Sequence, residues 1–454
     1  MLNMTLAAIA RCTQGVLHGS DARVHGVGTD SRALTPGMLF VALRGEHSDG
    51  HAFLAQAQAG GATGALVTRL QATAALPQVL VADALLALAA LARAARAATS
   101  AQVVGITGSS GKTTVKNLAS AILARVAPTH ATAGNQNNEI GLPLTLLNMA
   151  DDARYAVLEM GAGKPGDIAY LADIARPQVA LVNNVAAAHL ERLGSLDGVA
   201  ETKGAIYDAL PADGIAVINA DDAYAAAFAA RADTRRILAF GLAGTADVRA
   251  TDVAGDLHGS CFTLTTPAGT APVRLPLPGP HNVRNALAAA AIAHALDIAP
   301  ADIAAALAAV QPVRGRLLPR AMPGGWTLID DSYNANPGSV AAAITTLALA
   351  GGETWLVLGD LAELGPGAPA LLADLGTQAH TAGITRLWTV GKLSGHASAA
   401  FGSGARHFDT QQALAAALRD ALHGGVTCLV KGSRSAAMER VIAQLASGGS
   451  EHAV

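Results

Sequence analysis

The segment VVGITGSSGKTTVKN at residues 103–117 restricts the possible folds more than any other part of the chain. An apolar run ends at Thr107, four small or polar residues follow, and a helix-forming stretch begins near Lys112. A helix that starts directly after a buried strand points its backbone N–H groups and the positive end of its dipole at the turn, which suits a phosphate group. The segment therefore predicts a parallel α/β layer with a phosphate-binding turn.

The glycines of this segment do not have the common phosphate-loop spacing. In the pattern G-x-x-x-x-G-K-[ST], the first glycine would fall at Ile106, whereas the glycines here stand at Gly105 and Gly108. We still expect Lys112 to reach the β- and γ-phosphates and the hydroxyl of Thr113 to bind Mg²⁺. The predicted nucleotide-binding residues are Gly108, Ser109, Ser110, Gly111, Lys112, Thr113 and Thr114.

Apolar runs alternate with helix-forming segments over most of the chain, which predicts parallel α/β layers. The first hundred residues contain short strands at 38–43 and 64–68, and a β-rich stretch covers about 236–280. The segment QPVRGRLLPR at 311–320 is typical of a hinge, and four further apolar runs follow it without a dinucleotide-type glycine fingerprint. We predict an α/β fold with three domains, residues 1–100, 101–312 and 313–454, of which the last is Rossmann-like in its layering.

Composition excludes several classes of protein. The net charge of −3 gives no reason to expect nucleic acid or an anionic membrane as partner. Three distant cysteines without a C-x-x-C pair suggest neither a disulfide framework nor a zinc site, and fit a reducing cytoplasm. The first residues do not resemble a signal peptide. The apolar stretch 79–98 carries Asp83, Arg93 and Arg96, so it is expected to form an alanine-rich helix and not a membrane span.

Lysine is rare, with six residues against 25 arginines. Where arginine supplies most surface cations, the remaining lysines mark positions that need a compact ammonium or a titratable amine. Five of the six adjoin a glycine, which predicts that they lie at turns; these are Lys112, Lys164, Lys203, Lys392 and Lys431.

The form T-G-x-x-G-K-T resembles that of ATP-dependent amide ligases of the Mur and folylpolyglutamate type. Eight further segments follow in the order expected for the Mur ligase family: GNQNNEIGLP, VLEMGAG, NNVAAAHLERLGS, HNVRNALAA, RGR, DDSYNANPGS, LGDLAELG and VKGSR. The forms DSYNANP and KGSR are similar to the branch that joins D-alanyl-D-alanine to UDP-N-acetylmuramoyl-tripeptide. This resemblance implies a small UDP-binding domain, a central ATPase-like parallel sheet and a Rossmann-like third domain.

The resemblance also implies a metal site. Glu159 ends the apolar run YAVLE, and a carboxylate at the carboxyl edge of a parallel sheet suits Mg²⁺. The family places His189 at a second Mg²⁺ and carbamylates a lysine at the position of Lys203, which we expect early in a helix. Lys112, Glu159, His189 and Lys203 are thus the implied catalytic residues, and the last three with Thr113 the implied metal ligands.

Further binding residues follow from the same resemblance. Asn282, with His281 and Asn285 nearby, is implied at the adenine, Arg316 at the phosphates, and Asp331 at the ribose or a lysine network after the third domain closes. Ser31 and Arg32 are the candidates for binding the uridine nucleotide. The remaining implied substrate contacts are Asn135, Asn138, Asn334, Asn336, Lys431, Ser433 and Arg434.

The implied activity is that of an ATP-dependent acid–D-amino-acid ligase, which would work in two steps. The tripeptide carboxylate attacks the γ-phosphate of ATP to give an acyl phosphate and ADP, and the amine of D-alanyl-D-alanine then displaces phosphate. The product is the UDP-N-acetylmuramoyl-pentapeptide precursor of peptidoglycan. Because like charges meet in the first step, Lys112 and two Mg²⁺ ions would act as electrostatic clamps. We expect a cytoplasmic monomer without membrane insertion or a nucleic-acid partner.

Three alternatives remain. The preceding ligase of the pathway adds diaminopimelate or lysine, but its D-N-P-R motif is absent and DSYNANP stands where it tends to have DYAHTP. A folylpolyglutamate synthetase is disfavoured by the UDP-type first domain. A nucleotide-dependent switch with degenerate chemistry is disfavoured by the joint presence of the implied catalytic residues.

Overall fold

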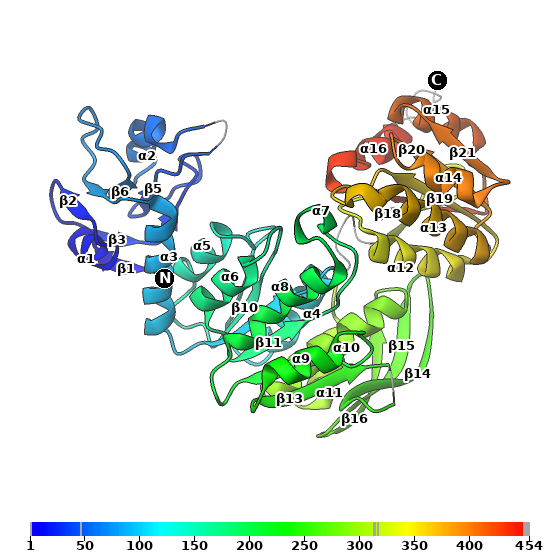
Figure 1. The fold of residues 1–454 in the computed structure, drawn as a ribbon, viewed down its shortest axis with the longest axis horizontal. Coiled ribbons are helices and arrows are strands. Elements are labelled where there is room, and N and C mark those ends of the chain that lie inside the picture. Colours follow the sequence, from blue (N-terminus) through cyan, green and yellow to red (C-terminus); the bar gives the residue numbers. More distant parts are fainter. Residues whose placement is uncertain (1, 46–47, 243, 312–314, 316, 448–454) are drawn as a thin grey trace.

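The computed structural model describes residues 2–45, 48–242, 244–311, 315 and 317–447. Figure 1 shows three bodies in chain order, the first in blue, the second in cyan to light green and the third in yellow to red. Each contains a sheet with helices packed on it, so the predicted α/β fold with three domains is confirmed. The domain limits at residues 100 and 312 stay a prediction, and most of the proposed hinge lies outside the described residues.

The first body contains a mainly parallel sheet of five short strands in the order β2-β7-β6-β5-β4 among the described residues. The strands expected at 38–43 and 64–68 are confirmed as β5 and β6. The elements are β1 (Asn3–Thr5), α1 (Leu6–Cys12), β2 (Val16–His18), β3 (Arg23–His25), β4 (Val27–Gly28), β5 (Leu39–Val41), η1 (Gly50–Phe53), α2 (Leu54–Ala59), β6 (Gly64–Val67), β7 (Gln78–Leu80) and α3 (Ala84–Ala98).

The helix expected over 79–98 begins only at Ala84. The Asp83 side chain accepts hydrogen bonds from the backbone N–H groups of Leu85 and Leu86, so Asp83 is the N-cap and the residues before it belong to strand β7 and a turn. Across the described ranges, no helix is long and apolar enough to cross a membrane.

The second body is built on a nine-stranded sheet, counted over the described residues, in the order β16-β15-β14-β13-β12-β11-β8-β10-β9. Strands β8 to β14 form parallel pairs. Strands β14, β15 and β16 form an antiparallel edge, which lies in the stretch 236–280 that was expected to be rich in β structure. The strands are β8 (Gln102–Thr107), β9 (Thr129–Ala131), β10 (Tyr155–Glu159), β11 (Val179–Val182), β12 (Ile215–Asn219), β13 (Arg236–Gly241), β14 (Val248–Asp256), β15 (Gly259–Thr266) and β16 (Gly269–Leu275).

The order of this sheet places the binding site. Strand β10 pairs with one side of β8 and β11 with the other, so the chain reverses its direction across the sheet at β8. Ligands of α/β sheets bind at the carboxyl end of the strands at such a reversal. The helices around this sheet are α4 (Lys112–Ala124), α5 (Gly141–Leu147), α6 (Asp167–Ala175), α7 (Leu190–Leu193), α8 (Leu196–Asp208), α9 (Ala225–Ala232), α10 (Pro280–Ala295) and α11 (Pro300–Ala308).

The third body has a six-stranded sheet, within the described part of the chain, in the order β17-β18-β22-β19-β20-β21. Its four predicted strands are confirmed, while the antiparallel edge strand β17 and the strand β21 were not predicted. The elements are β17 (Leu318–Ala321), β18 (Thr327–Asp331), α12 (Pro337–Leu347), η2 (Ala348–Ala350), β19 (Glu353–Gly359), η3 (Gly365–Gly367), α13 (Ala368–Thr381), β20 (Arg386–Val390), α14 (Gly395–Phe401), β21 (Ala405–Phe408), α15 (Gln411–Ala421), β22 (Val426–Lys431), η4 (Arg434–Ala436) and α16 (Glu439–Ser447).

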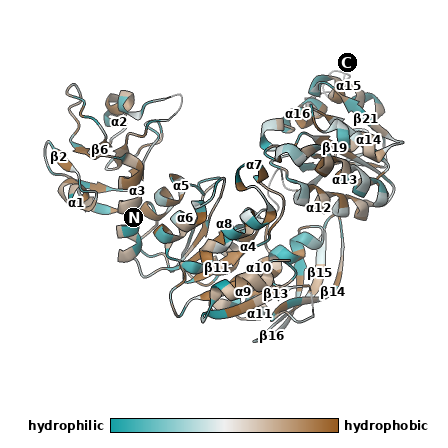
Figure 2. Ribbon diagram, viewed as in Figure 1, coloured by the Kyte–Doolittle hydropathy of each residue, from teal (hydrophilic) through white to brown (hydrophobic). Residues whose placement is uncertain are grey.

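The hydrophobic cores show which bodies are packed together. One core joins the first body to the second through buried leucines of α3, such as Leu88 and Leu91, and through α5 and α6. The third body has two cores of its own, one on each face of its sheet. Figure 2 shows hydrophobic colour on the strands inside each body, whereas the helices around them carry both hydrophobic and hydrophilic colour. The first two bodies are therefore one packed unit, to which the third is attached.

Candidate active site

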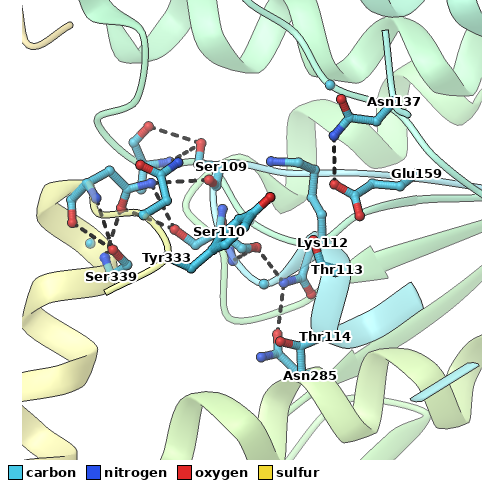
Figure 3. Close-up of a pocket in the computed structure, with 18 of the residues that line it drawn as sticks. Ser109, Ser110, Lys112, Thr113, Thr114, Asn137, Glu159, Asn285, Tyr333 and Ser339 are labelled. Carbon is cyan, nitrogen blue, oxygen red and sulfur yellow. Dashed lines mark hydrogen bonds between the residues drawn. The ribbon is translucent and has the colours of Figure 1, made fainter. Parts of the chain in front are cut away.

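A cavity of about 950 Å³ lies at the carboxyl ends of β8, β10 and β11, where the third body meets the second (Figure 3). Most residues predicted from the sequence line this cavity. They include Ser109 to Thr114, Asn135, Asn138, Glu159, His189, Asn282, Asp331, Asn334, Asn336 and Lys431.

The unusual glycine spacing has a structural cause. Ile106 is a fully buried residue of strand β8, so the turn does not begin there. Gly108 has φ +151°, and a Cβ on it would lie 3.0 Å from the Cβ of Asn183. Gly111 starts helix α4 with φ +76°, and a Cβ there would lie 2.4 Å from Oδ1 of Asn285. Both positions need glycine because of their backbone angle and the close approach of an asparagine.

Two asparagines that the sequence did not single out hold the phosphate loop. The Oδ1 atom of Asn184 accepts a hydrogen bond from the Ser110 N–H at 2.9 Å. The Asn183 amide donates to the Ser110 carbonyl at 2.9 Å and to Oδ1 of Asn285 at 3.0 Å. Lys112 Nζ donates to the Gly108 carbonyl at 2.8 Å across the loop. The signal for the two asparagines was their place directly after the apolar run of strand β11.

Glu159 fits a cation site. It is the last residue of β10 and is 3% exposed, and its Oε1 accepts a hydrogen bond from the Asn137 amide at 2.8 Å. Its Oε2 is buried without a hydrogen-bond partner in the part of the chain that the structure describes. A buried carboxylate oxygen without a donor is unfavourable unless a cation binds it. Asn137 is a further site residue that the sequence prediction missed, between Asn135 and Asn138.

A cluster of three or more His, Cys, Asp or Glu residues suited to a metal does not occur among the described residues. Mg²⁺ does not need one, since it is usually held by one or two carboxylates together with water and substrate phosphates. The predicted ligand Thr113 lines the same cavity as Glu159.

Lys203 lies in the middle of helix α8, so its predicted place early in a helix is wrong, as is the expectation of a turn. A glycine follows it because Gly204 faces Phe228, whose Cε1 would be 3.1 Å from an added Cβ. The side chain is 1% exposed, and burial, with a smaller effect of the Lys112 charge, lowers its pKa well below the ordinary lysine value. A lowered pKa increases the fraction of the amine that is neutral, and the neutral amine is the form that reacts with CO₂.

His189 lies where the second and third bodies meet. Its Nδ1 contacts the carboxylate of Glu363 from the third body, and the backbone N–H of Glu191 donates to the Glu363 carbonyl at 3.3 Å. Glu363 belongs to the LGDLAELG segment but was not predicted as a site residue. The role of His189 as a metal ligand stays a prediction.

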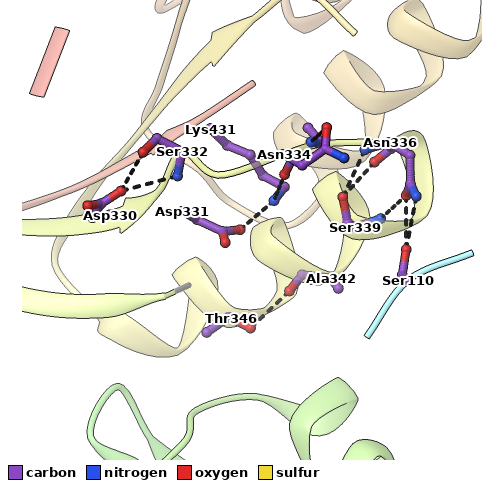
Figure 4. Close-up of polar contacts among 11 residues, drawn as sticks. Ser110, Asp330, Asp331, Ser332, Asn334, Asn336, Ser339, Ala342, Thr346 and Lys431 are labelled. Atoms are coloured by element: carbon purple, nitrogen blue, oxygen red, sulfur yellow. Dashed lines mark hydrogen bonds and ion pairs between the residues drawn. The ribbon is translucent and has the colours of Figure 1, made fainter. Parts of the chain in front are cut away.

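The third body contributes a polar network (Figure 4). Lys431 is buried, and its Nζ donates to Oδ2 of Asp331 at 2.6 Å and to the Asn334 carbonyl at 3.0 Å. Ser433 and Arg434 do not line the cavity. Ser433 donates to the Asp360 carbonyl, and the Arg434 backbone N–H donates to Oδ1 of Asn334, so both residues support the network from behind.

On the predicted adenine side, Asn282 donates to the Pro278 carbonyl at 2.8 Å, and Asn285 donates to Asn282. The neighbouring His281 has a buried Nδ1 without a hydrogen-bond partner among the described residues. Burial, with the nearby charges of Lys431 and Arg284, lowers the pKa of His281 to about 4. Arg316 lies outside the described residues.

Ser31 and Arg32 lie in the first body and do not line the cavity. Arg32 pairs with Asp30 at 2.8 Å, which lowers the pKa of that carboxyl to about 2, and Ser31 donates to Gln56 at 2.9 Å. A substrate that contacted both these two residues and the cavity would have to be long.

Family models match three consecutive parts of the chain. The Mur ligase family catalytic domain matches residues 23–106, the Mur ligase middle domain 106–293, and the Mur ligase glutamate ligase domain 314–434. The UDP-N-acetylmuramoyl-tripeptide–D-alanyl-D-alanine ligase of Escherichia coli K12 is 46% identical over 99% of this chain and 100% of its own length. The chain belongs to the Mur ligase family.

Two solved structures resemble this Mur ligase along most of its length. A crystal structure of MurF from Acinetobacter baumannii has a TM-score of 0.92 at 35% identity, and covers 98% of this chain and 99% of its own. MurF from Thermotoga maritima in complex with ADP has a TM-score of 0.83 at 29% identity, with 93% and 97% coverage. The family resemblance predicted from the sequence is confirmed.

Proposed function

We propose that this Mur ligase joins D-alanyl-D-alanine to UDP-N-acetylmuramoyl-tripeptide at the expense of ATP, and so makes the pentapeptide precursor of peptidoglycan. The observation that carries the proposal is the 46% identity over the full length to a ligase of that name. The cavity supports it, because it combines a phosphate loop with a buried carboxylate and polar groups of the third body.

Several residues have separate roles in the first step of the reaction. In that step a carboxylate oxygen of the tripeptide bonds to the γ-phosphorus of ATP, and the bond from that phosphorus to the β–γ bridging oxygen breaks to release ADP. Lys112 lies across the phosphate loop and would neutralise charge on the phosphates, and the backbone N–H groups at the start of α4 would bind their oxygens. Asp331, held by Lys431, would orient the ribose.

In the second step the dipeptide amine bonds to the acyl carbon and phosphate leaves. Closure of the third body over the cavity would exclude water, which would otherwise hydrolyse the acyl phosphate. Asn135 and Asn138 line the same cavity as Glu159 and would contact the peptide. Ser31 and Arg32 would bind the distant uridine nucleotide.

Glu159 and Thr113 would hold Mg²⁺, which supplies positive charge to the phosphate oxygens. The free Oε2 of Glu159 is the observation that favours this role. Lys203, once carbamylated, would add an anionic ligand, and His189 would take part if its contact with Glu363 opens. A cytoplasmic location fits the use of ATP and the three free cysteines.

Product-resolved assays test the substrate assignment. The full chain is incubated with ATP, Mg²⁺ and either the UDP-muramoyl tripeptide or the UDP-muramoyl dipeptide, with either D-alanyl-D-alanine or single amino acids as the amine. We expect pentapeptide only from the tripeptide and D-alanyl-D-alanine. Ligation of a free amino acid to the UDP-muramoyl dipeptide would instead identify the preceding ligase.

Substitution of the phosphate-loop lysine tests the site. Lys112→Ala is expected to lower kcat by at least about 100-fold, because a preorganised positive charge at the transferred phosphate is lost. Lys392→Ala in the third body serves as the matched control, since Lys392 is exposed and does not line the cavity. Substantial ligation by Lys112→Ala would contradict the assignment.

A further inference from the structure

We infer that Asn336 is a positioning residue of the phosphate loop and not a contact to the peptide substrate. It belongs to the third body and is 226 residues from Ser110 in sequence, yet its side chain lies directly on the loop (Figure 4). The inference rests on the proposed function only in that a nucleotide must bind at residues 108–114.

All four hydrogen-bonding positions of the Asn336 amide are used. Nδ2 donates to the Ser109 carbonyl at 3.1 Å and to Oγ of Ser110 at 3.0 Å. Oδ1 accepts from Oγ of Ser110 at 3.1 Å and from the backbone N–H of Ser339 at 2.9 Å. The first three bonds connect the two bodies, and the fourth caps helix α12. A side chain satisfied in this way has no hydrogen-bonding group left for a peptide.

The backbone around Asn336 also packs against the second body. A Cβ added to Gly338 would lie 3.1 Å from the Cβ of Ala186. Ala186 in turn accepts a hydrogen bond from Oγ of Ser109 and donates one to it. The start of α12 therefore contacts both segments that shape the phosphate loop.

These contacts are compatible with a bound nucleotide. Phosphate oxygens bind to N–H groups and to the lysine, whereas Asn336 uses a carbonyl oxygen and a hydroxyl. The same contacts can therefore persist when a nucleotide is bound, and they hold Ser109 and Ser110 in place beforehand. A loop that is already ordered loses less entropy on binding, so the contact should raise nucleotide affinity.

Asn336→Ser separates this role from helix capping. Serine remains a good N-cap for α12, but its side chain is too short to reach Ser109 and Ser110. Since two or more net hydrogen bonds are lost, we expect the Kd for ADP and the KM for ATP to rise about tenfold. The KM for D-alanyl-D-alanine should change by less than about twofold.

Ser339→Ala is the matched control, because it removes the bond from the Asn336 N–H to Oγ of Ser339 in the capping box and leaves the contacts to the loop. It should leave the Kd for ADP within about twofold of the wild type. Thermal unfolding of both variants is measured, so that unfolding of helix α12 caused by either substitution would be detected.

A double-mutant cycle with Ser110→Ala completes the test. If Asn336 acts through Ser110, Asn336→Ser must weaken ADP binding less in the Ser110→Ala protein than in the wild type. Strictly additive effects, or an unchanged Kd for ADP in Asn336→Ser, would overturn the inference. A rise confined to the KM for the dipeptide would also overturn it and make Asn336 a substrate contact. Failure of the wild type to bind ADP would instead count against the proposed function.

Discussion

Lys203 is a buried amine that holds its proton less strongly than an exposed lysine. Its pKa is lowered by burial and by the Lys112 charge. Between this lowered pKa and the ordinary lysine pKa, the folded protein therefore binds fewer protons at Lys203 than the unfolded chain does. Stability therefore rises with pH between the folded and the unfolded pKa values. Burial of this amine therefore costs folding free energy at pH values below the ordinary lysine pKa.

Lys203→Met should consequently make the protein more stable and inactive. In CO₂-free buffer at neutral pH we expect a gain of ~1 kcal/mol or more in the free energy of unfolding, since an ionisable amine is no longer buried. Urea unfolding and the ligation assay measure the two effects. A variant that is both less stable and fully active would contradict this view of Lys203.

His281 predicts a pH dependence of stability. Its folded pKa of about 4 lies below the ordinary histidine value, so the unfolded chain binds the extra proton first as the pH falls. Stability contributed by the neutral ring is lost from about pH 6.5 down to about pH 4, by about 1.4 kcal/mol for each pH unit between the two pKa values. His281→Gln should flatten this part of the stability curve. The exposed His258→Gln should leave it unchanged.

At the scale of elements, the hydroxyl of Tyr207 joins helix α8 by hydrogen bonds to two strands of the central sheet. Oη of Tyr207 donates to the Val217 carbonyl of β12 at 2.9 Å and accepts from the Val182 N–H of β11 at 3.0 Å. Tyr207 lies one helical turn after Lys203, on the same side of α8. These two hydrogen bonds fix the position of helix α8, and with it the buried Lys203, relative to strands β11 and β12.

Tyr207→Phe should lower the free energy of unfolding by about 1 kcal/mol, because two buried hydrogen bonds are lost while the ring still packs on Phe228. Urea unfolding measures the change. Tyr224→Phe, which removes a hydroxyl bond to Asp197 at an exposed position, should have little effect. Equal losses in both variants would show that the sheet does not depend on Oη of Tyr207.

At the scale of the whole molecule, the arrangement of cores predicts how the protein opens. The first two bodies share one core, whereas the third has two cores of its own. The third body meets the second through polar contacts of Asn336 and Glu363, and the partly buried Leu257, between β14 and β15, packs against one of its cores. Polar contacts at an exposed junction are weaker than a common hydrophobic core. The third body should therefore unfold and reorient independently.

A pair of core truncations tests this. Leu91→Ala at the shared core and Leu372→Ala in α13 each remove a fully buried side chain, at an expected cost of about 2–5 kcal/mol. Hydrogen exchange should speed up across the first two bodies in Leu91→Ala and only in the third body in Leu372→Ala. Faster exchange of all three bodies in both variants would contradict the division into two units.

Much of the fold and part of the site were predictable because they depend on local order. Strand β8, its turn and helix α4 lie within one short segment, and the apolar runs mark most strands. Very short strands such as β4 and β21 were missed because two to four residues carry too little pattern. Asn137, Asn183 and Asn184 were missed because an asparagine in a turn is common and its partner is not visible in the sequence.

The sequence by itself determined that a phosphate loop follows β8 and that a carboxylate ends β10, because each depends on neighbours along the chain. Only the tertiary structure decided which residues of the third body lie against this site. The third body brings Asn336 onto Ser110 and Glu363 onto His189, over 226 and 174 residues of sequence. The fold also buries Lys203, which lowers its pKa. Such contacts depend on the packing of separate sheets, which no local pattern encodes.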